Sequence, residues 1–173
     1  ILPFEPPYFT KHGLPCTFVG HMITELGIEN IPREKFRQEN HINSQDTLIC
    51  LLPGSRRGEV ERLLPVFKET LIKLSLLHPS LKIVVPVVNS VENLVREGLY
   101  DIGVPLIFVQ SHQRYEAMRA CNVALAASGT VNLELAMAQV PFVIGYKMNT
   151  LSSWLMKWLL KIKYMTMVNI LLD

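Results

Sequence analysis

Short apolar runs alternate with amphipathic segments from residue 47 onward, and this alternation constrains the fold more than any other feature of the sequence. Five runs have the length of a buried strand: residues 47–53, 81–88, 105–109, 122–127 and 141–146. Segments suited to helices separate them, at residues 60–74, 90–99, 113–121 and 131–139. Strands and helices that alternate in this way form right-handed βαβ units. The sequence therefore predicts an α/β fold with a parallel sheet covered by helices on both faces.

The segments on either side of this alternation differ from it. Residues 1–46 are irregular and rich in proline, and we expect a connecting segment with one short helix in the charged run 29–39. Residues 47–150 form the predicted α/β domain, in which Pro65 either kinks the first helix or marks its first turn. Residues 151–173 are predicted to be an amphipathic basic helix and tail.

Composition and charge exclude several classes of protein. The chain of 173 residues is 49% hydrophobic and only 18% charged, which excludes a disordered chain. Its net charge of +2 provides no strong field for nucleic acid. The charge is uneven, because residues 1–134 have 13 basic and 14 acidic side chains, a net of −1, whereas no acid lies between Glu134 and Asp173.

The cysteines and histidines show no metal-binding spacing. Cys16, Cys50 and Cys121 are far apart, so we expect free thiols in a reducing compartment, with Cys50 and Cys121 buried. No C-x-x-C, H-x-x-H or H-E-x-x-H occurs, and no metal site is predicted. The longest uncharged stretch near the apolar maximum has 14 residues, which is too short to span a membrane.

Two loops that follow predicted strands are suited to bind anions. Gly54, Ser55 and Arg56 come directly after the first strand, where glycine permits close approach of the backbone and the N–H groups of a helix start attract anions. A guanidinium binds phosphate oxygens through two hydrogen bonds. Taken alone, this loop is equally well interpreted as an ordinary capped turn with solvated arginines.

The second loop follows the fourth predicted strand. Ser128, Gly129 and Thr130 place two hydroxyl groups at a helix start, and Glu134 lies one turn further on. A carboxylate there can accept hydrogen bonds from the two hydroxyls of a ribose, although a solvated helix position is the alternative. Parallel strands end at one edge of a sheet, so two such loops suggest a nucleotide diphosphate as ligand. Neither the P-loop nor the G-x-G-x-x-G pattern occurs.

The tail contains an apolar stripe at helical spacing. Trp154 and Trp158 belong to the stripe, and Lys157 and Lys161 lie opposite. This composition is typical of a helix that lies on a membrane surface. A stripe of this kind more often packs on the domain core or on a partner. Such packing and binding to a membrane surface are compatible if part of the stripe stays exposed.

Several motifs together resemble the lipid-A-disaccharide synthase family. They are LPFE at residues 2–5, CTFVGH at 16–21, LLPGSR at 51–56, SGTVNLE at 128–134, PFVIGYK at 141–147 and, after Tyr164, VNILL at 168–172. These motifs occur in the order of the family and cover nearly the whole chain. One departure is Met22, which follows His21 where the family often has proline.

The resemblance implies an inverting glycosyltransferase of the two-domain GT-B fold, and this chain is similar to its Rossmann-like, donor-binding half. Such enzymes transfer 2,3-diacylglucosamine from UDP-2,3-diacylglucosamine to lipid X (2,3-diacylglucosamine 1-phosphate). The products are lipid A disaccharide and UDP, and no metal or other cofactor is implied.

The resemblance also implies a role for individual residues. Residues 54–56 are expected to neutralise the diphosphate, with Arg56 as the cation, and residues 128–130 to seat phosphate at the helix start. Glu134 is expected to hold the ribose. The strand end around Val109 is expected to face the uracil through backbone groups, and Asn169 to lie near the donor.

Location and partners follow from the same resemblance. The full-length enzyme is expected in the bacterial cytoplasm, peripheral on the cytoplasmic face of the inner membrane. Its partners are the UDP-diacylglucosamine donor, the lipid X acceptor and the membrane surface, and a homodimer is allowed; no nucleic acid is expected. The acceptor domain, which should supply the general base, is expected outside this chain, so we expect the fragment alone to be inactive.

Two other interpretations stay open from the sequence. A UDP-N-acetylglucosamine 2-epimerase has a similar nucleotide-binding half, but it should show acidic and histidine catalytic residues in these loops, and we find none. A non-catalytic nucleotide-binding or membrane-docking module is the second alternative.

Overall fold

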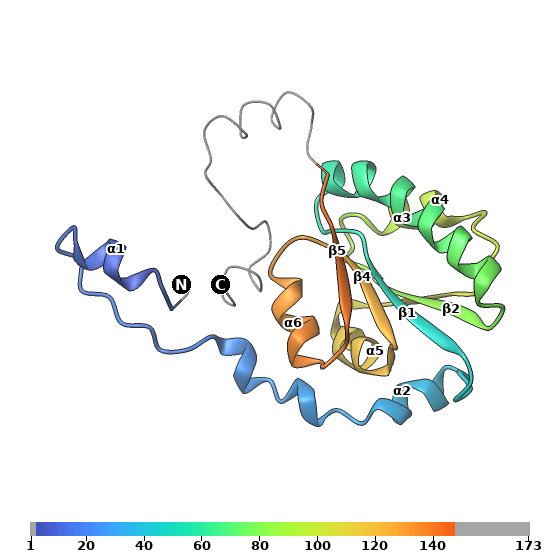
Figure 1. Ribbon diagram of the computed structural model, residues 1–173, viewed down its shortest axis with the longest axis horizontal. Helices are drawn as coiled ribbons and strands as arrows, with labels where there is room; N and C mark the ends of the chain where they lie inside the picture. The colour runs from blue at the N-terminus through green and yellow to red at the C-terminus, as the bar shows by residue number, and fades with distance from the viewer. Residues whose placement is uncertain (1–2, 148–173) are drawn as a thin grey trace.

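The computed structural model describes residues 3–147 of the chain, and these contain a five-stranded sheet (Figure 1). The strands are β1 (Thr47–Leu52), β2 (Leu81–Pro86), β3 (Leu106–Val109), β4 (Val123–Ala127) and β5 (Phe142–Gly145). They lie in the order β3-β2-β1-β4-β5, and every neighbouring pair is parallel. Each strand falls within its predicted run, so the predicted α/β class with a parallel sheet is confirmed, and the strand order is that of a Rossmann-like fold.

The helices that connect the strands are α3 (Arg57–Leu77), α4 (Glu92–Leu99), α5 (Arg114–Ala120), preceded by the 3-10 helix η3 (Ser111–Gln113), and α6 (Val131–Met137). All four predicted helices are therefore present. α3 begins at Arg57, well before Pro65, and continues to Leu77. The interpretation of Pro65 as the first turn of this helix is wrong, because α3 has already formed two turns before it reaches the proline.

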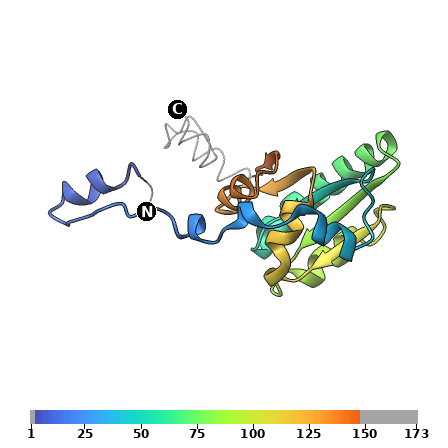
Figure 2. The ribbon, with the colours of Figure 1, turned by 90° about the horizontal axis from the view of Figure 1, so that it is seen from below.

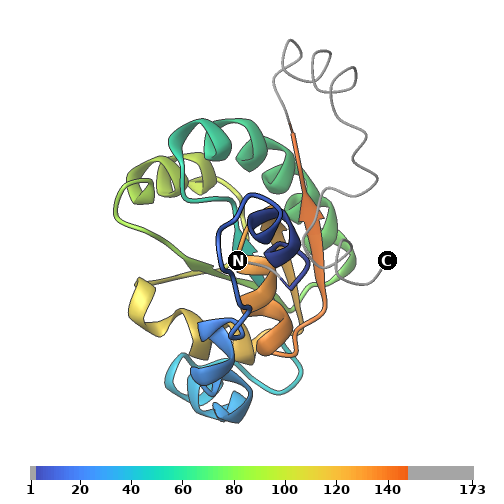
Figure 3. The same cartoon turned by 90° about the vertical axis from the view of Figure 1, so that its left-hand side faces the viewer.

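The side chains of β1 alternate between two apolar layers. Leu48, Cys50 and Leu52 belong to the layer that includes α5 and α6, whereas Ile49 and Leu51 belong to the layer that includes α3 and α4. The sheet lies between these two layers of helices (Figure 3). Both faces of the sheet are thus buried, as the continuous apolar character of the strands predicted.

The elements before β1 are α1 (Pro6–Thr10), the 3-10 helices η1 (Met22–Glu25) and η2 (Ile28–Asn30), and α2 (Arg33–Glu39). None of residues 3–22 is buried, and α1 lies away from the sheet (Figure 2). From Ile23 onward the chain joins the core, because Ile23, Ile28 and Phe36 are buried in the same layer as α5 and α6. The short helix predicted within residues 29–39 is present as α2, and its segment completes one face of the sheet.

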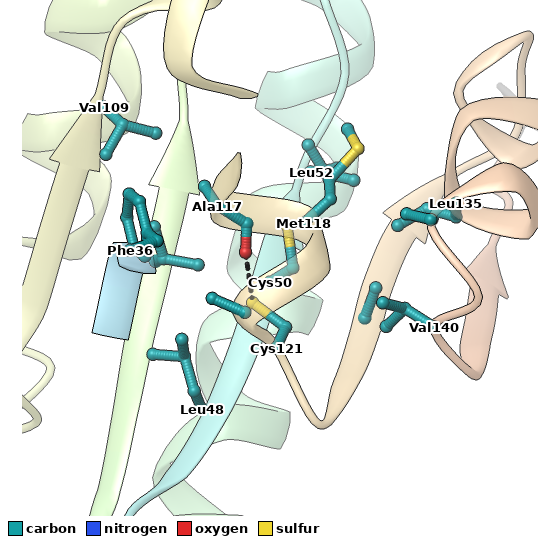
Figure 4. Packing of buried hydrophobic residues seen from close by; sticks show 14 of the residues in the cluster. Phe36, Leu48, Cys50, Leu52, Val109, Ala117, Met118, Cys121, Leu135 and Val140 are labelled. Atoms are coloured by element: carbon teal, nitrogen blue, oxygen red, sulfur yellow. Dashed lines mark hydrogen bonds between the residues drawn. The ribbon is translucent and has the colours of Figure 1, made fainter. Parts of the chain in front are cut away.

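The two buried cysteines lie in this layer (Figure 4). The Cys121 Sγ donates a hydrogen bond to the carbonyl oxygen of Ala117 at 3.0 Å. Burial, reinforced by the neighbouring Cys50, raises the pKa of the Cys121 thiol well above its ordinary value. A thiol that stays protonated is a poor nucleophile, which suits Cys121 to a packing role. Both Cys50 and Cys121 are buried in the core, as predicted. All three cysteines are free, and Cys16 is half-buried.

Arg37 of α2 is a buried charge that connects α2 to the rest of the domain. Its Nη1 donates to the carbonyl oxygen of Ala120 at 2.9 Å, and its Nη2 donates to those of Asn43 at 2.7 Å and Asp46 at 2.8 Å. Only 3% of Arg37 is exposed. One guanidinium therefore joins α2, the loop that leads into β1, and the end of α5.

Replacing Arg37 with alanine should lower the free energy of unfolding by about 3 kcal/mol, because three carbonyl groups lose a charged donor. Arg37→Lys should recover only part of this loss, since an ammonium group lacks the planar fork that reaches all three acceptors. Arg33→Ala, at the exposed start of the same helix, is the matched control and should change stability by less than about 0.5 kcal/mol. Equal losses for the two alanine variants in urea unfolding would contradict this role of Arg37.

Candidate functional site

The loops that follow β1 and β4 meet at one edge of the sheet. β1 and β4 are hydrogen-bonded neighbours, with Leu52 of β1 opposite Ala126 of β4, so their carboxyl ends lie side by side. The chain leaves β1 for α3 on one face of the sheet and leaves β4 for α6 on the other. Such a reversal opens a crevice beyond the strand ends, where open α/β sheets bind their ligands.

A cleft lies at this position, and most of the predicted site residues line it. They are Gly54, Ser55, Ser128, Gly129, Thr130 and Glu134. The structure therefore brings together two loops that are more than seventy residues apart in the sequence, along with the acid one turn into α6.

Other predicted site residues do not line the cleft. The exposed Arg56 is the N-cap of α3 and is absent from the lining. Val109 is buried in the core, and its carbonyl oxygen accepts a hydrogen bond from the Val87 N–H at 3.0 Å. From this end of the sheet Ser111 contributes to the lining instead. Asn169 lies outside the described residues, as do the predicted membrane-surface residues Trp154, Lys157, Trp158 and Lys161.

The loop after β1 is held by an acid from the helix that follows. Gly54 has φ +119°, a conformation that residues with a Cβ rarely adopt, and a Cβ added there would lie 2.3 Å from Oε2 of Glu59. The same Oε2 accepts a hydrogen bond from the Ser55 N–H at 3.2 Å. Glu59 therefore lies directly over the loop, and its carboxylate engages an N–H group that would otherwise face the cleft.

The loop after β4 borders open space in the cleft and leads directly into α6. The N–H groups of Asn132 and Leu133 donate to the carbonyl oxygens of Gly129 and Thr130, at 3.3 and 3.0 Å, and begin α6. A Cβ at Gly129 would meet no atom within 4 Å, so the space above this residue is empty. Thr130 is the N-cap of α6, and its hydroxyl makes no capping hydrogen bond.

Glu134 is paired with a cation that the sequence did not single out. Its Oε1 lies 2.9 Å from Nη2 of Arg114, at the start of α5. Burial raises the pKa of Glu134, while Arg114 and a hydrogen bond with Tyr115 lower it in opposition. The carboxylate is thus partly withdrawn from water and held beside a guanidinium inside the cleft.

Glu59, Ser111 and Arg114 were all missed as members of the site. For Ser111 and Arg114 a signal existed, because they follow the third predicted strand, at the same edge of the sheet as the two anion-binding loops. Nothing in the local sequence pairs Arg114 with Glu134, which lies twenty residues further along the chain. For Glu59 a signal also existed. It is the third residue of α3, a position at which an acid commonly caps the start of its own helix.

The arrangement is chemically suited to bind a polar, anionic ligand. Its lining combines two strand-to-helix loops with four hydroxyl groups, one guanidinium and two carboxylates, those of Glu59 and Glu134. Among residues 3–147, no group of three or more His, Cys, Asp or Glu side chains is placed to hold a metal ion. No helix in this part of the chain is both long and apolar enough to cross a membrane.

The strand order and the reversal between β1 and β4 define a Rossmann-like domain of the kind found in GT-B glycosyltransferases. A glycosyl transferase of family 9 from Veillonella parvula DSM 2008 has this fold (TM-score 0.53, 17% identity), over 76% of this chain and 43% of that one. A UDP-GlcNAc 2-epimerase from Neisseria meningitidis, solved with UDP-GlcNAc, also has it (TM-score 0.54, 19% identity, 73% of this chain and 35% of that one). At these identities the likeness shows the fold alone.

Sequence comparison is more specific. Residues 1–173 match the family described as lipid-A-disaccharide synthetase. A lipid-A-disaccharide synthase of Rhodospirillum centenum is 46% identical over 174 residues, and one of Paramagnetospirillum magneticum is 40% identical over 175 residues; both cover 100% of this chain. The chain belongs to the lipid-A-disaccharide synthase family, which confirms the predicted resemblance and decides against the epimerase. It spans less than half the length of these relatives, 43% and 45%.

Replacing Gly54 with alanine should lower the free energy of unfolding by about 2 kcal/mol, because the new Cβ adds backbone strain and collides with Glu59. Gly20→Ala is the control for strain alone, since Gly20 has φ +93° and no atom within 4 Å of an added Cβ. The double variant Gly54→Ala/Glu59→Ala should regain the part of the loss due to the collision. Thermal unfolding that shows no gain in the double variant would rule out the collision.

Proposed function

We propose that this chain is the donor-binding part of a lipid-A-disaccharide synthase. The full-length enzyme would transfer 2,3-diacylglucosamine from UDP-2,3-diacylglucosamine to lipid X, forming lipid A disaccharide and UDP. The single observation that supports the site most strongly is that the loops after β1 and β4 and the acid Glu134 line one cleft, at the position where this fold binds ligands. Membership of the family supports the choice of reaction.

In this proposal the diphosphate lies between the two loops. The N–H groups of residues 54–55 and the hydroxyls of Ser128 and Thr130 would bind its oxygens, and Arg56, exposed at the start of α3, would turn inward to pair with them. Because Glu59 engages the Ser55 N–H in this structure, its carboxylate would have to give up that bond when phosphate binds there. Glu134 would accept hydrogen bonds from the ribose, and the uracil would extend toward the end of β3.

This site would contribute to catalysis by stabilising the leaving group. As the glycosidic bond to the donor breaks, negative charge builds on the β-phosphate of UDP, and fixed donors in the cleft lower the energy of that state. We assign the general base and the acceptor contacts to the part of the full-length enzyme that this chain does not include. The 173 residues alone should then form no disaccharide, and turnover by them would refute this assignment.

The chain should bind UDP weakly, and Arg56→Ala should weaken this binding about tenfold, because charge-assisted hydrogen bonds to the diphosphate are lost. Arg57→Ala is the matched control: Arg57 is exposed and paired with Glu61 at 2.8 Å, so its loss should leave the affinity unchanged. Isothermal titration calorimetry at fixed salt measures both. Equal affinities for Arg56→Ala and the unchanged chain would count against the diphosphate site.

We further propose that the tail lets the enzyme reach lipid substrates, peripheral on the cytoplasmic face of the inner membrane. The support is compositional: two tryptophans lie on one side of a helical pattern and lysines on the other, in a segment without acids. Both substrates of the proposed reaction have acyl chains, so a lipid surface is where they would be found. A homodimer is compatible with the proposal but has no support of its own.

Replacing both Trp154 and Trp158 with serine in the full-length protein should reduce its co-sedimentation with anionic phospholipid vesicles several-fold, because two anchoring side chains are lost. Tyr8→Ser removes an aromatic side chain that is 71% exposed on α1 and is the matched control. If the unchanged full-length protein is not retained by anionic vesicles at low salt, the membrane-surface proposal fails.

A further inference from the structure

Arg114 is the only guanidinium that lines the described cleft, and its side chain contacts Glu134, which also lines the cleft, and the neighbouring Tyr115. Its Nη2 lies 2.9 Å from Oε1 of Glu134 and also donates to the hydroxyl of Tyr115. Its Cζ lies 4.6 Å from the centre of the Tyr115 ring. Tyr115 is also near enough to Glu134 to lower the pKa of that carboxyl group. Three side chains from two helices therefore form one network centred on Arg114.

The network is not arranged for stability alone. Nε of Arg114 is shielded from water and has no hydrogen-bond partner, which is costly for a charged donor. The acid is only 17% exposed, so it too has given up much of its hydration. Partly buried charges with an unmet donor are more common in functional sites than in structural ion pairs, because such sites retain groups that stability would remove.

The acid can bind a ribose well only in its ionised form. An ionised carboxylate accepts hydrogen bonds on both oxygens, whereas a protonated one has a donor in place of an acceptor. Burial favours the protonated form, and Arg114 favours the ionised form. The elements packed against α6 also contain Glu25 and Glu29, on η1 and η2, but the groups that shift the pKa of Glu134 are Arg114 and Tyr115.

We propose that Arg114 is a positioning residue that holds Glu134 ionised and oriented as the acceptor for the ribose hydroxyls of the bound nucleotide. The inference rests on the proposed donor site and deepens it. Arg114 acts through Glu134 in this proposal, and does not bind the diphosphate itself. Direct contact between Arg114 and phosphate is the main competing interpretation, and the experiment below distinguishes the two.

The experiment compares the affinity of the chain for UDP with that for 2′,3′-dideoxy-UDP, between pH 8 and pH 5.5. The ratio of the two affinities isolates the ribose hydroxyls, because titration of the diphosphate is common to both ligands. We expect the unchanged chain to favour UDP about tenfold. Glu134→Gln should reduce this preference to less than about threefold at every pH, since a neutral amide replaces the charged acceptor.

The variant that tests the proposal is Arg114→Ala. Without the guanidinium the pKa of Glu134 rises further, so the carboxyl group becomes protonated at a higher pH as the solution is acidified. The preference for UDP should therefore persist at pH 8 and be lost on acidification, at a pH where the unchanged chain still shows it. Arg114→Lys, which keeps the positive charge, should restore much of the unchanged profile. Arg62→Ala, an exposed arginine of α3 outside the cleft, is the control for net charge.

A second measurement needs no ligand. The pKa of the Glu134 side chain, followed by carbon NMR, should be higher in Arg114→Ala than in the unchanged chain and in Arg62→Ala. An unaltered pKa would overturn the inference whether or not nucleotide binds. A fall in affinity for both nucleotides with an unchanged ratio would also overturn it, in favour of phosphate contact. If UDP fails to bind the unchanged chain at all, the donor site itself is wrong, and the inference falls with it.

Discussion

The pairing of β1 with β2 on one side and with β4 on the other is the constraint on which the rest of the structure depends. It makes β1 the central strand, so its side chains must be apolar on both faces, as Leu48, Cys50, Ile49 and Leu51 are. It also makes the connections that follow two neighbouring strands leave the sheet in opposite directions, α3 toward one layer after β1 and α6 toward the other after β4. The open cleft follows from that divergence, because the helices that follow β1 and β4 lie on opposite faces of the sheet.

The sequence was sufficient to predict the strands of the sheet and the helices that connect them because their signals are local. Runs of apolar residues ending in proline, glycine or serine mark the strands, and α3 shows its helical spacing directly. Contacts between distant residues left no such signal. Arg37 looks like a solvated residue in a charged helix, yet it is buried against Ala120, eighty-three residues away. The resemblance implied a contact between the uracil and backbone groups around Val109; the Val109 side chain is buried in the core and does not line the cleft, and the backbone contact stays a prediction.

The cleft contains both positive and negative groups, a combination that the two anion-binding loops alone did not suggest. Two acids, Glu59 and Glu134, line a site whose proposed ligand is an anion. Each is already engaged, Glu59 with a backbone N–H and Glu134 with a guanidinium, but only the charge of Glu134 is balanced by a cation. The two engagements differ in consequence. In the proposed donor site, the first occupies a donor that phosphate would use, whereas the second keeps an acceptor ready for hydroxyl groups. Phosphate binding would then reorganise one loop, and ribose binding would use groups that are already in place.

Fold and family give different kinds of information about such a site. The same sheet occurs in a glycosyl transferase and in a 2-epimerase with nearly equal TM-scores, so the backbone alone does not determine the reaction. What the two share is the crevice beyond the strand ends, and it follows from topology. Which ligand binds then depends on a few side chains around that crevice. Which reaction occurs depends on the groups outside the domain that face the crevice. In this chain the cleft combines one Arg114–Glu134 pair with two hydroxyl-bearing loops, and the relatives are more than twice as long as the chain. In the proposed full-length enzyme, this domain would supply a positioned donor and a stabilised leaving group, and the reaction would depend on what faces them.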